Sequence, residues 1–490
     1  MTEVLPMLDI DPAMSRKMHL VNNTLDEIGW TPFHTKLFCL NGFGYGVDSL
    51  QVSIQGIIAG QAAYEFAPSY ARSLTIALYT GMLVGALFWG STADIIGRKF
   101  AFNVSLFVCS AFTIVAGAAP SWNSLAFFVA FAAFGAGGNL ILDTTILLEY
   151  IPHNKQWLVT WLAAWWGVGC MIGGFVAWGF MPNFSCSDPS VAPFTECTRG
   201  SNMGWRYVFF TIGALIFVLS ILRVTIIRLR ETPKFLLGQG KDAELVEHFQ
   251  LLASKYNRTC SLTLEKLEAC GTINARKGSK WSPGEFFLHV SSLFSSRKVS
   301  ITSVLLILSW MMIGLAYPLF NVFLPSYLAS RGVQFGITST YETWRNYALN
   351  QVVSIFGPIL AGHMCETKIF GRKYTMAVGG LITMAFFFAY SQVTSQVQNV
   401  AYSCVISFTL EIYVATLYGY TVEVLPSAHR ATGNGIMVAL NRLMGIISAV
   451  IATEANTNTP VPVFICAALY GALAIIAAVF PFEPYGKRAS

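Results

Sequence analysis

The stretch GSTADIIGRK, from Gly90 to Lys99, ends one apolar segment and begins the next, with its charged residues in the turn between them. Its last three letters recur as GRK at 371–373, and an E-x-x-P pattern at Glu149 recurs at Glu423. Both repeats have the same offset, since 371 − 97 and 423 − 149 are both 274. Weak internal symmetry is typical of transporter folds. The two halves of the chain are therefore predicted to be copies of one helical unit.

The composition around this repeat is that of a membrane protein. Of the 490 residues, 54% are hydrophobic and 11% are charged, whereas soluble domains carry roughly 25% charged residues. Apolar runs long enough to cross about 30 Å of hydrocarbon occur twelve times, six in each half. We therefore predict an all-α membrane protein with twelve transmembrane helices in two six-helix bundles, with spans at 37–60, 74–93, 100–119, 124–148, 157–181, 206–228, 301–325, 345–364, 374–393, 397–420, 431–453 and 461–481.

The basic residues predict the orientation, because Lys and Arg are retained on the cytoplasmic side of a membrane. If both termini are cytoplasmic, the cytoplasmic segments hold 24 of the 31 Lys and Arg residues and the exterior segments hold five. The net charge of +6 then reflects topology, and no nucleic-acid partner is expected. The predicted organisation is a cytoplasmic N-terminal segment at 1–36, bundles at 37–228 and 301–481, a cytoplasmic linker with short amphipathic helices at 229–300, and a cytoplasmic tail at 482–490.

Three segments carry a family resemblance. GSTADIIGRK resembles the G-x-x-x-D-x-x-G-R-K loop of the major facilitator superfamily, and YGYTVEVLPSAHRATG (418–433) resembles a motif of its sugar-porter group. NGFGYGVDSL (41–50) is similar to the branch with synaptic vesicle protein-like transporters, bacterial nicotinate-type carriers and fungal organic solute carriers. The span at 301–325 lacks the paired glutamines of true sugar porters, which puts a sugar substrate in doubt.

The resemblance implies two bundles that rock around a central site and a conformational latch on the cytoplasmic side. The alternative for the latch charges is that they serve membrane topology alone. The residues that match the latch are Gly90, Asp94, Gly97, Arg98, Lys99, Glu149, Gly371, Arg372, Lys373, Glu423 and Arg430.

Few ionisable residues lie inside the predicted spans, and three of them lie twelve residues from a charged cytoplasmic end. At about 1.5 Å per residue these three, Asp48, Glu411 and Arg442, are roughly 18 Å deep. Asp143 is about 9 Å deep by the same arithmetic. Ionisable groups at such depth mark ion or substrate paths. We expect Asp48, with Asp143 or Glu411, to couple transport to protons; the alternative is a permanent ion pair, such as Glu411 with Arg442.

Arg442 has two explanations, since a guanidinium does not lose its charge in a protein. It neutralises Glu411 or another acid, or it presents its forked donors to a carboxylate or phosphate of the substrate. The sequence leaves both open, and the two could alternate during transport. The residues that we expect to bind substrate are Arg442, Asn139, Trp165, Tyr317 and Asn321.

The predicted function is secondary active transport of a small organic anion or carboxylate by alternating access, coupled to protons. The alternatives are a sugar or neutral-metabolite carrier, an exporter of the same fold, or, in a different class, a nutrient receptor without net transport. The sequence contains no phosphate loop, paired metal ligands or nucleophile with a base, so we expect no enzyme, cofactor or metal. Small solutes, protons and the lipid bilayer are the expected partners of a monomer in the plasma membrane.

Ten cysteines are spread along the chain, and two share the predicted exterior loop after the fifth span. An oxidising exterior permits a disulfide there. Cys186 and Cys197 are therefore a candidate bridge, and the other eight cysteines are expected to stay reduced.

Overall fold

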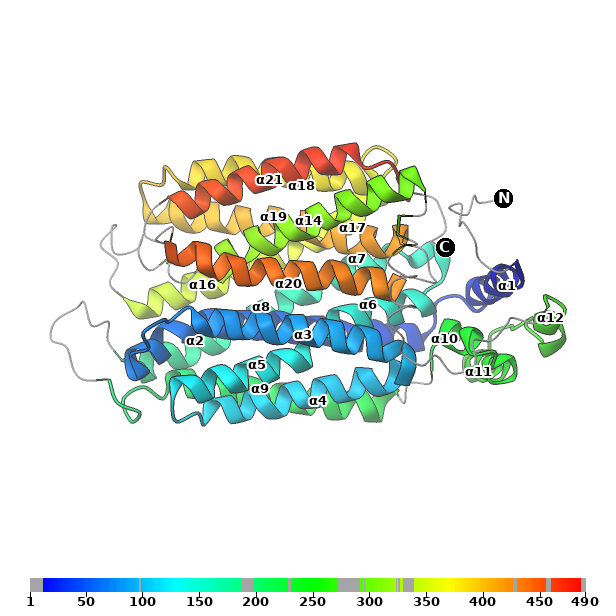
Figure 1. The fold of residues 1–490 in the computed structure, drawn as a ribbon, viewed down its shortest axis with the longest axis horizontal. Coiled ribbons are helices and arrows are strands. Elements are labelled where there is room, and N and C mark those ends of the chain that lie inside the picture. Colours follow the sequence, from blue (N-terminus) through cyan, green and yellow to red (C-terminus); the bar gives the residue numbers. More distant parts are fainter. Residues whose placement is uncertain are drawn as a thin grey trace.

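The computed structural model describes residues 12–96, 98–186, 197–227, 231–271, 291, 293–294, 296–322, 324, 327–328, 339–425, 430–454 and 460–485. Within these ranges the regular elements are helices, and no strand occurs. The long helices lie side by side along one axis (Figure 1). The α-helices are α1 (Pro12–Ile28), α2 (Pro32–Phe66), α3 (Ser73–Ile96), α4 (Arg98–Gly117), α5 (Trp122–Ala136), α6 (Asn139–Tyr150), α7 (Leu158–Leu162), α8 (Ala164–Phe184), α9 (Gly204–Leu222), α10 (Pro233–Gly238), α11 (Asp242–Lys255), α12 (Leu264–Glu268), α14 (Arg297–Asn321), α16 (Thr340–Ser354), α17 (Phe356–Cys365), α18 (Gly371–Tyr390), α19 (Gln396–Val424), α20 (Arg430–Glu454) and α21 (Val461–Val479).

The helices form two groups, which we call the first half (α2 to α9) and the second half (α14 to α21). Within the first half α3 packs on α5 and α4 packs on α9, and within the second half α18 packs on α19 and α21. The two halves meet where α20 packs on α3 and α16 packs on α8 (Figure 1). Each half therefore has its own packing, and a smaller set of helix pairs joins the halves.

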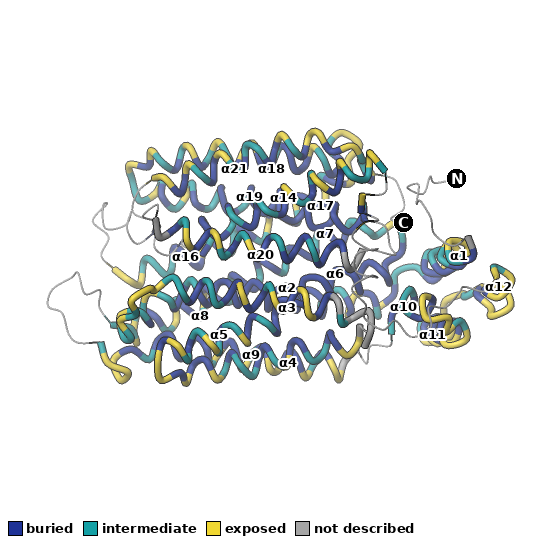
Figure 2. Tube along the Cα trace, in the orientation of Figure 1, coloured by how far each residue is buried: buried dark blue, intermediate teal, exposed yellow. Residues whose placement is uncertain are grey.

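The outer faces of these helices are apolar. Phe88, Phe107, Phe127 and Phe388 are each about half exposed, and Figure 2 shows exposed positions along the outer helices with buried ones between the halves. A soluble protein rarely exposes so much apolar surface, whereas a bilayer covers it. In the described ranges ten helices or consecutive helix pairs are long and apolar enough to cross a membrane.

Those ten segments coincide with ten of the predicted spans. The other two predictions, 37–60 and 374–393, fall on α2 and α18, which are helices of 35 and 20 residues packed among the rest. They are not among the ten because their sequences are less apolar. The total of twelve spans stays a prediction.

A second, smaller hydrophobic core lies beyond one end of the long helices, where Figure 1 shows α1 next to α10, α11 and α12. The predicted linker with short amphipathic helices, 229–300, contains α11, whose Leu245, Phe249 and Leu252 are buried. They pack with Val21 and Leu25 of α1. The N-terminal segment 1–36 was expected only as a polar segment, so this packing of α1 against the linker is a feature that the sequence reasoning missed.

Candidate functional site

A small cavity lies between the two halves. The first half contributes side chains from α2, α3 and α8, and the second half contributes side chains from α14, α19 and α20. The family resemblance implies that the two halves rock around a central site, and this cavity lies where such a site would be. The residues that line it are Val52, Tyr79, Trp166, Ile313, Gly314, Tyr317, Pro318, Tyr418, Asn441 and Arg442.

Arg442 forms an ion pair with Asp48 at the edge of this cavity. The Arg442 Nη2 atom lies 2.6 Å from Asp48 Oδ2, and the exposed fractions of the two residues are 3% and 0%. The pair joins α20 of the second half to α2 of the first. Among the described residues, Arg442 Nε and Asp48 Oδ1 have no hydrogen-bond partner. The pair therefore uses one donor and one acceptor and leaves others available, although buried charges normally have their hydrogen bonds satisfied.

Glu411 is not the partner of Arg442, although the sequence reasoning named it as the example of one. Glu411 lies on α19, is 3% exposed, and has its carboxylate near the Tyr317 side chain. Its Oε2 atom has no hydrogen-bond partner within the described ranges. Depth along a helix predicted that both residues lie near the membrane centre, but the rotation of α2, α19 and α20 about their axes determines which acid faces the arginine.

Aromatic rings form much of the cavity wall. Trp166 Nε1 donates to the Tyr317 hydroxyl, and their ring centroids are 5.8 Å apart in an edge-on arrangement. Tyr418 stacks on Trp310 with centroids 4.8 Å apart and planes 9° apart. These contacts hold the rings of Trp166, Tyr317 and Tyr418 in place at the cavity.

Asp143 has a different partner, Arg223, which directly follows α9 and falls within the predicted span 206–228. Arg223 Nη2 lies 2.7 Å from Asp143 Oδ1, and Arg223 Nη1 donates to the Phe102 carbonyl at 2.8 Å. The guanidinium also lies 3.4 Å from the centre of the Phe102 ring. Gly44 of α2 lies directly against the Asp143 carboxylate. This pair is buried entirely within the first half.

The other predicted substrate-binding residues lie elsewhere. The Trp165 ring packs on Phe43, with centroids 4.7 Å apart, and Asn139 accepts a hydrogen bond from Ser105 at 3.1 Å. Asn321 is the last residue of α14 and is not part of the cavity lining. Of the five expected residues, the structure brings Arg442 and Tyr317 to the cavity. Trp166, next to Trp165, lines it instead, because a change of one position rotates a side chain by about 100° on a helix.

The second copy of the predicted latch forms a charge cluster. Arg372 Nε and Nη2 each lie 3.0 Å from a Glu423 oxygen, and Arg372 Nη1 donates to the Cys365 carbonyl. Glu483, which the sequence reasoning missed, accepts from the backbone N–H groups of Arg372 and Lys373 at 3.0 and 3.1 Å. A carboxylate at this position stabilises the first turn of α18.

The first copy of the latch is only partly described. Gly97 and the side chains of Asp94 and Arg98 lie outside the described residues, and so does the side chain of Arg430 in the second copy. Lys99 is exposed, and Glu149 is buried on α6. Gly90 and Gly371 lie on α3 and α18, and Gly371 has a φ of +53°, which favours glycine.

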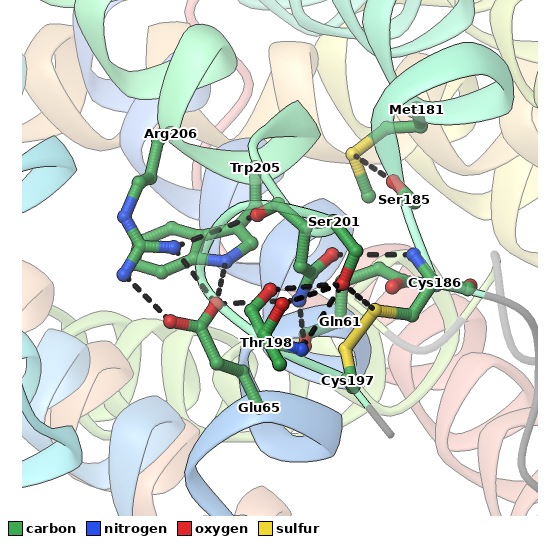
Figure 3. The surroundings of a disulfide bond; sticks show 11 residues. Gln61, Glu65, Met181, Ser185, Cys186, Cys197, Thr198, Ser201, Trp205 and Arg206 are labelled. Carbon is green, nitrogen blue, oxygen red and sulfur yellow. Dashed lines mark hydrogen bonds and ion pairs between the residues drawn. A yellow bond between two sulfur atoms is a disulfide. The ribbon is translucent and has the colours of Figure 1, made fainter. Parts of the chain in front are cut away.

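A polar cluster lies at the end of the molecule opposite α10 to α12, next to a disulfide between Cys186 and Cys197 (Figure 3). Arg206 Nη1 and Nη2 each lie 2.8 Å from a Glu65 oxygen, and Trp205 Nε1 donates to Glu65 at 3.1 Å. The cluster ties the end of α2 to the start of α9. No group of three His, Cys, Asp or Glu side chains in the described ranges is placed to hold a metal ion.

Comparison with known proteins extends over nearly the whole chain. A family model described as Major Facilitator Superfamily matches residues 42–449. The chain is 37% identical to "MFS siderochrome iron transporter 1" of Ceriporiopsis subvermispora, over 98% of this chain and 92% of that protein. It is 27% identical to the niacin transporter NiaP of Acinetobacter baylyi, over 86% of this chain and 87% of that protein.

The solved structures with a similar fold include a sugar symporter. The proton:xylose symporter XylE, bound to 6-bromo-6-deoxy-D-glucose, superimposes with a TM-score of 0.70 over 93% of this chain and 98% of that chain, at 14% sequence identity. XylE is an E. coli protein. At this identity the similarity concerns the fold.

Proposed function

The chain belongs to the Major Facilitator Superfamily and is a membrane transporter of that fold, and on this premise we propose that it carries a small organic anion, a carboxylate, coupled to protons. Alternating access of the two halves would move the solute from one side of the membrane to the other. The observation that carries this proposal is the buried guanidinium of Arg442 at the cavity, with a donor that no described residue accepts from.

The chemistry of Arg442 favours a carboxylate. A guanidinium presents donors in a planar fork that matches two carboxylate oxygens. In the structure Asp48 takes only one bond from this fork. A substrate carboxylate that replaced Asp48 would form a second bond and satisfy the donor that is now unpaired. A substrate with a carboxylate would gain this second bond, whereas a neutral sugar has no carboxylate with which to form it.

Proton coupling follows from the same pair. If a substrate carboxylate takes the guanidinium, Asp48 loses its counter-charge in a buried site, which strongly favours its neutral form. Binding of the anion and of a proton would then be linked at Asp48. Asp143 is less suited to this exchange, because its arginine lies in the same half and both stay together when the halves move.

The relatives are compatible with this proposal. One is named as a niacin transporter, and niacin is a carboxylic acid, whereas another is named for siderochrome iron. The alternatives are a sugar or neutral-metabolite carrier, an exporter, or a receptor without net transport, and measurements of flux must distinguish them.

We also propose the finer topology: twelve spans, both termini in the cytoplasm, and a monomer in the plasma membrane. The asymmetric distribution of Lys and Arg along the sequence supports the orientation, whereas the plasma membrane and the monomer rest on the family resemblance alone. The disulfide is consistent with an oxidising exterior at that end of the molecule.

The test is flux in proteoliposomes with an imposed proton gradient, comparing pyridine-3-carboxylate and benzoate with xylose. We expect gradient-driven accumulation of the carboxylates. Arg442→Ala should abolish it, and Arg442→Lys should raise the half-saturation concentration at least about tenfold, because lysine cannot bind both oxygens in a plane. The matched control is Arg345→Ala, since Arg345 is an exposed arginine of the second half. Xylose uptake that survives Arg442→Ala would contradict the anion assignment, and binding without uptake would favour a receptor.

A further inference from the structure

Glu411 differs from the other buried carboxylates near the interface of the halves, and we infer from it that the substrate is amphoteric. This inference rests on the proposed function: Arg442 binds the substrate carboxylate, and Glu411 with the Tyr317 hydroxyl receives a cationic or N–H-donating group of the same molecule. The substrate class would be inner salts with a carboxylate and a quaternary or protonated ring nitrogen.

The first observation is that Glu411 lacks a basic partner. Asp48, Asp143 and Glu423 each lie within 3.0 Å of an arginine nitrogen, as does Glu65 at the far end of the first half. In the described part of the chain Glu411 has no such ion pair, and its Oε2 atom has no hydrogen-bond partner. A buried carboxylate without a positive neighbour is strongly unfavourable when charged. A cationic ligand would supply the missing charge.

The second observation is the position of Glu411 relative to the cavity. Tyr317 lines the cavity, and its side chain lies near Glu411. Tyr418, which also lines the cavity, lies seven residues further along α19, so the two residues share a helix face about 10.5 Å apart. Gly357 of α17 packs behind Glu411, where an added Cβ would lie 2.9 Å from the Glu411 Cβ. Glu411 therefore lies behind one wall of the cavity, and Arg442 lines the cavity itself.

The third observation is the set of aromatic rings that line the cavity. Tyr79, Trp166, Tyr317 and Tyr418 all line the cavity. The faces of aromatic rings attract cations, and aromatic surroundings are typical of sites that recognise quaternary ammonium groups. A simple aliphatic anion would gain little from four such rings, whereas a pyridinium or methylammonium group would contact them favourably.

The charges of the site lead to the same substrate class. Ionised Asp48 and Glu411 carry two negative charges against the single positive charge of Arg442. A substrate monoanion would add a third negative charge, whereas an inner salt would add none. With one proton on Asp48, an inner salt leaves the site neutral in total, which is the most favourable balance inside a membrane.

The experiment compares two ring carboxylates that differ in the positive nitrogen: N-methylpyridinium-3-carboxylate and benzoate. In wild-type proteoliposomes we expect the half-saturation concentration of the inner salt to be at least about tenfold below that of benzoate. Glu411→Gln, which keeps the size of the side chain, should reduce this ratio to near one, whatever its effect on maximal rate. Tyr317→Phe, which removes only the hydroxyl, should reduce the ratio in the same direction.

The control is Glu342→Gln, the same chemical change at an exposed carboxylate of the second half, which should keep the wild-type ratio. A wild-type protein that transports both carboxylates without preferring the inner salt overturns this inference and leaves the proposed function standing. A Glu411→Gln protein with an unchanged ratio also overturns it. If wild type transports neither carboxylate, the proposed function itself fails, and this inference fails with it.

Discussion

At the scale of single residues, the two buried arginine–aspartate pairs have the same chemistry and different consequences. Arg442 and Asp48 come from different halves, so their contact must change when the halves move. Arg223 and Asp143 both come from the first half, so their contact moves as a unit. A buried pair that loses one partner is strongly destabilised. The Arg442–Asp48 pair is therefore placed to respond to substrate, whereas the Arg223–Asp143 pair is placed to hold α6 against the end of α9.

Gly44 tests the second pair without changing its charges. A Cβ at this position would overlap the Asp143 carboxylate and the Arg223 guanidinium, so Gly44→Ala should destabilise the protein by about 1–3 kcal/mol. In a helix the same change usually stabilises by roughly 0.5–1 kcal/mol. The matched control is Gly60→Ala on the same helix, where no heavy atom lies within 4 Å of the added Cβ. Melting temperatures in detergent check both, and a Gly44→Ala protein as stable as the control would contradict this account of the site.

His34 predicts a pH dependence of stability. It lies before the predicted span 37–60, and burial lowers its pKa from 6.5 to about 4, although its hydrogen bond to the Tyr150 carbonyl acts in the opposite sense. The Thr31 N–H donates to Nδ1 at 3.1 Å, and Nε2 lies 3.0 Å from the Tyr150 carbonyl oxygen. If Nδ1 were protonated, its N–H would face the Thr31 N–H, and two donors would meet without an acceptor between them.

The unfolded state therefore binds more protons than the folded state between about pH 4 and 6.5, and the stability that neutral His34 contributes is lost as the pH falls through this window. The effect is at most about 3 kcal/mol. Melting temperatures at pH 4.5 and 7.5 should differ less in His34→Gln than in wild type. The control is His19→Gln, an exposed histidine of α1, which should keep the wild-type difference. An unchanged difference in His34→Gln would refute the role of this imidazole.

At the scale of elements, α2, the helix that contributes Asp48, is less apolar than most of the other long helices. Buried Asn41, Gln51 and Gln55 lie on α2 together with Asp48, and they make it too polar to stand among the ten apolar candidates. Gln51 and Gln55 donate to Thr113 and Thr75 inside the first half. A helix surrounded by protein does not need an apolar surface on every side, so low hydropathy here reflects burial between other helices.

The connection between α8 and α9 depends on the disulfide. Cys186 and Cys197 are 11 residues apart in sequence, and a cross-link over a loop of this size stabilises by about 3 kcal/mol in the chain-entropy model. The double variant Cys186→Ser with Cys197→Ser should melt at lower temperature than wild type, and a reductant should lower wild type to the same value. The control replaces Cys260 and Cys270, which are free in the structure. A serine double variant with wild-type melting would show that the bridge does not stabilise this end.

At the scale of the whole molecule, the halves touch on both sides of the cavity. Towards the disulfide end, Gly174 of α8 packs on Ala348 of α16. Towards α10 to α12, Trp161 of α7 packs on Gly362 of α17, and its Nε1 atom donates to the Ile359 carbonyl at 3.1 Å. Alternating access would require one of these two contacts to separate before solute can enter from that side.

A cross-link tests whether the contact between α8 and α16 opens. A Cβ added at Gly174 would lie 3.5 Å from the Ala348 Cβ, which suits a disulfide. Oxidation of the variant Gly174→Cys with Ala348→Cys should remove nearly all transport, and a reductant should restore it. Gly179→Cys with Ala348→Cys is the control, since no heavy atom lies within 4 Å of a Cβ at Gly179. Wild type under the same oxidant checks the native cysteines, and full transport by the cross-linked protein would show that this contact stays closed throughout the cycle.

The sequence by itself determined the membrane class, the superfamily, the helical segments and the positions of the charged residues along each helix. These properties depend on local composition and on distance along one helix, and both can be counted from the residues. It also indicated Arg442 as the central charge, because a permanent cation at that depth needs a reason to be there.

Only the tertiary structure decided which acid pairs with each buried arginine. Arg442 lies 394 positions from Asp48 in sequence, and Arg223 lies 80 positions from Asp143. Which of several acids at similar depth meets an arginine depends on how each helix is rotated and on which helices are neighbours. The same rotation places Trp166 and not Trp165 at the cavity and leaves Glu411 without a basic partner among the described residues. Rotation about a helix axis results from packing across the whole molecule, and no count along the chain contains it.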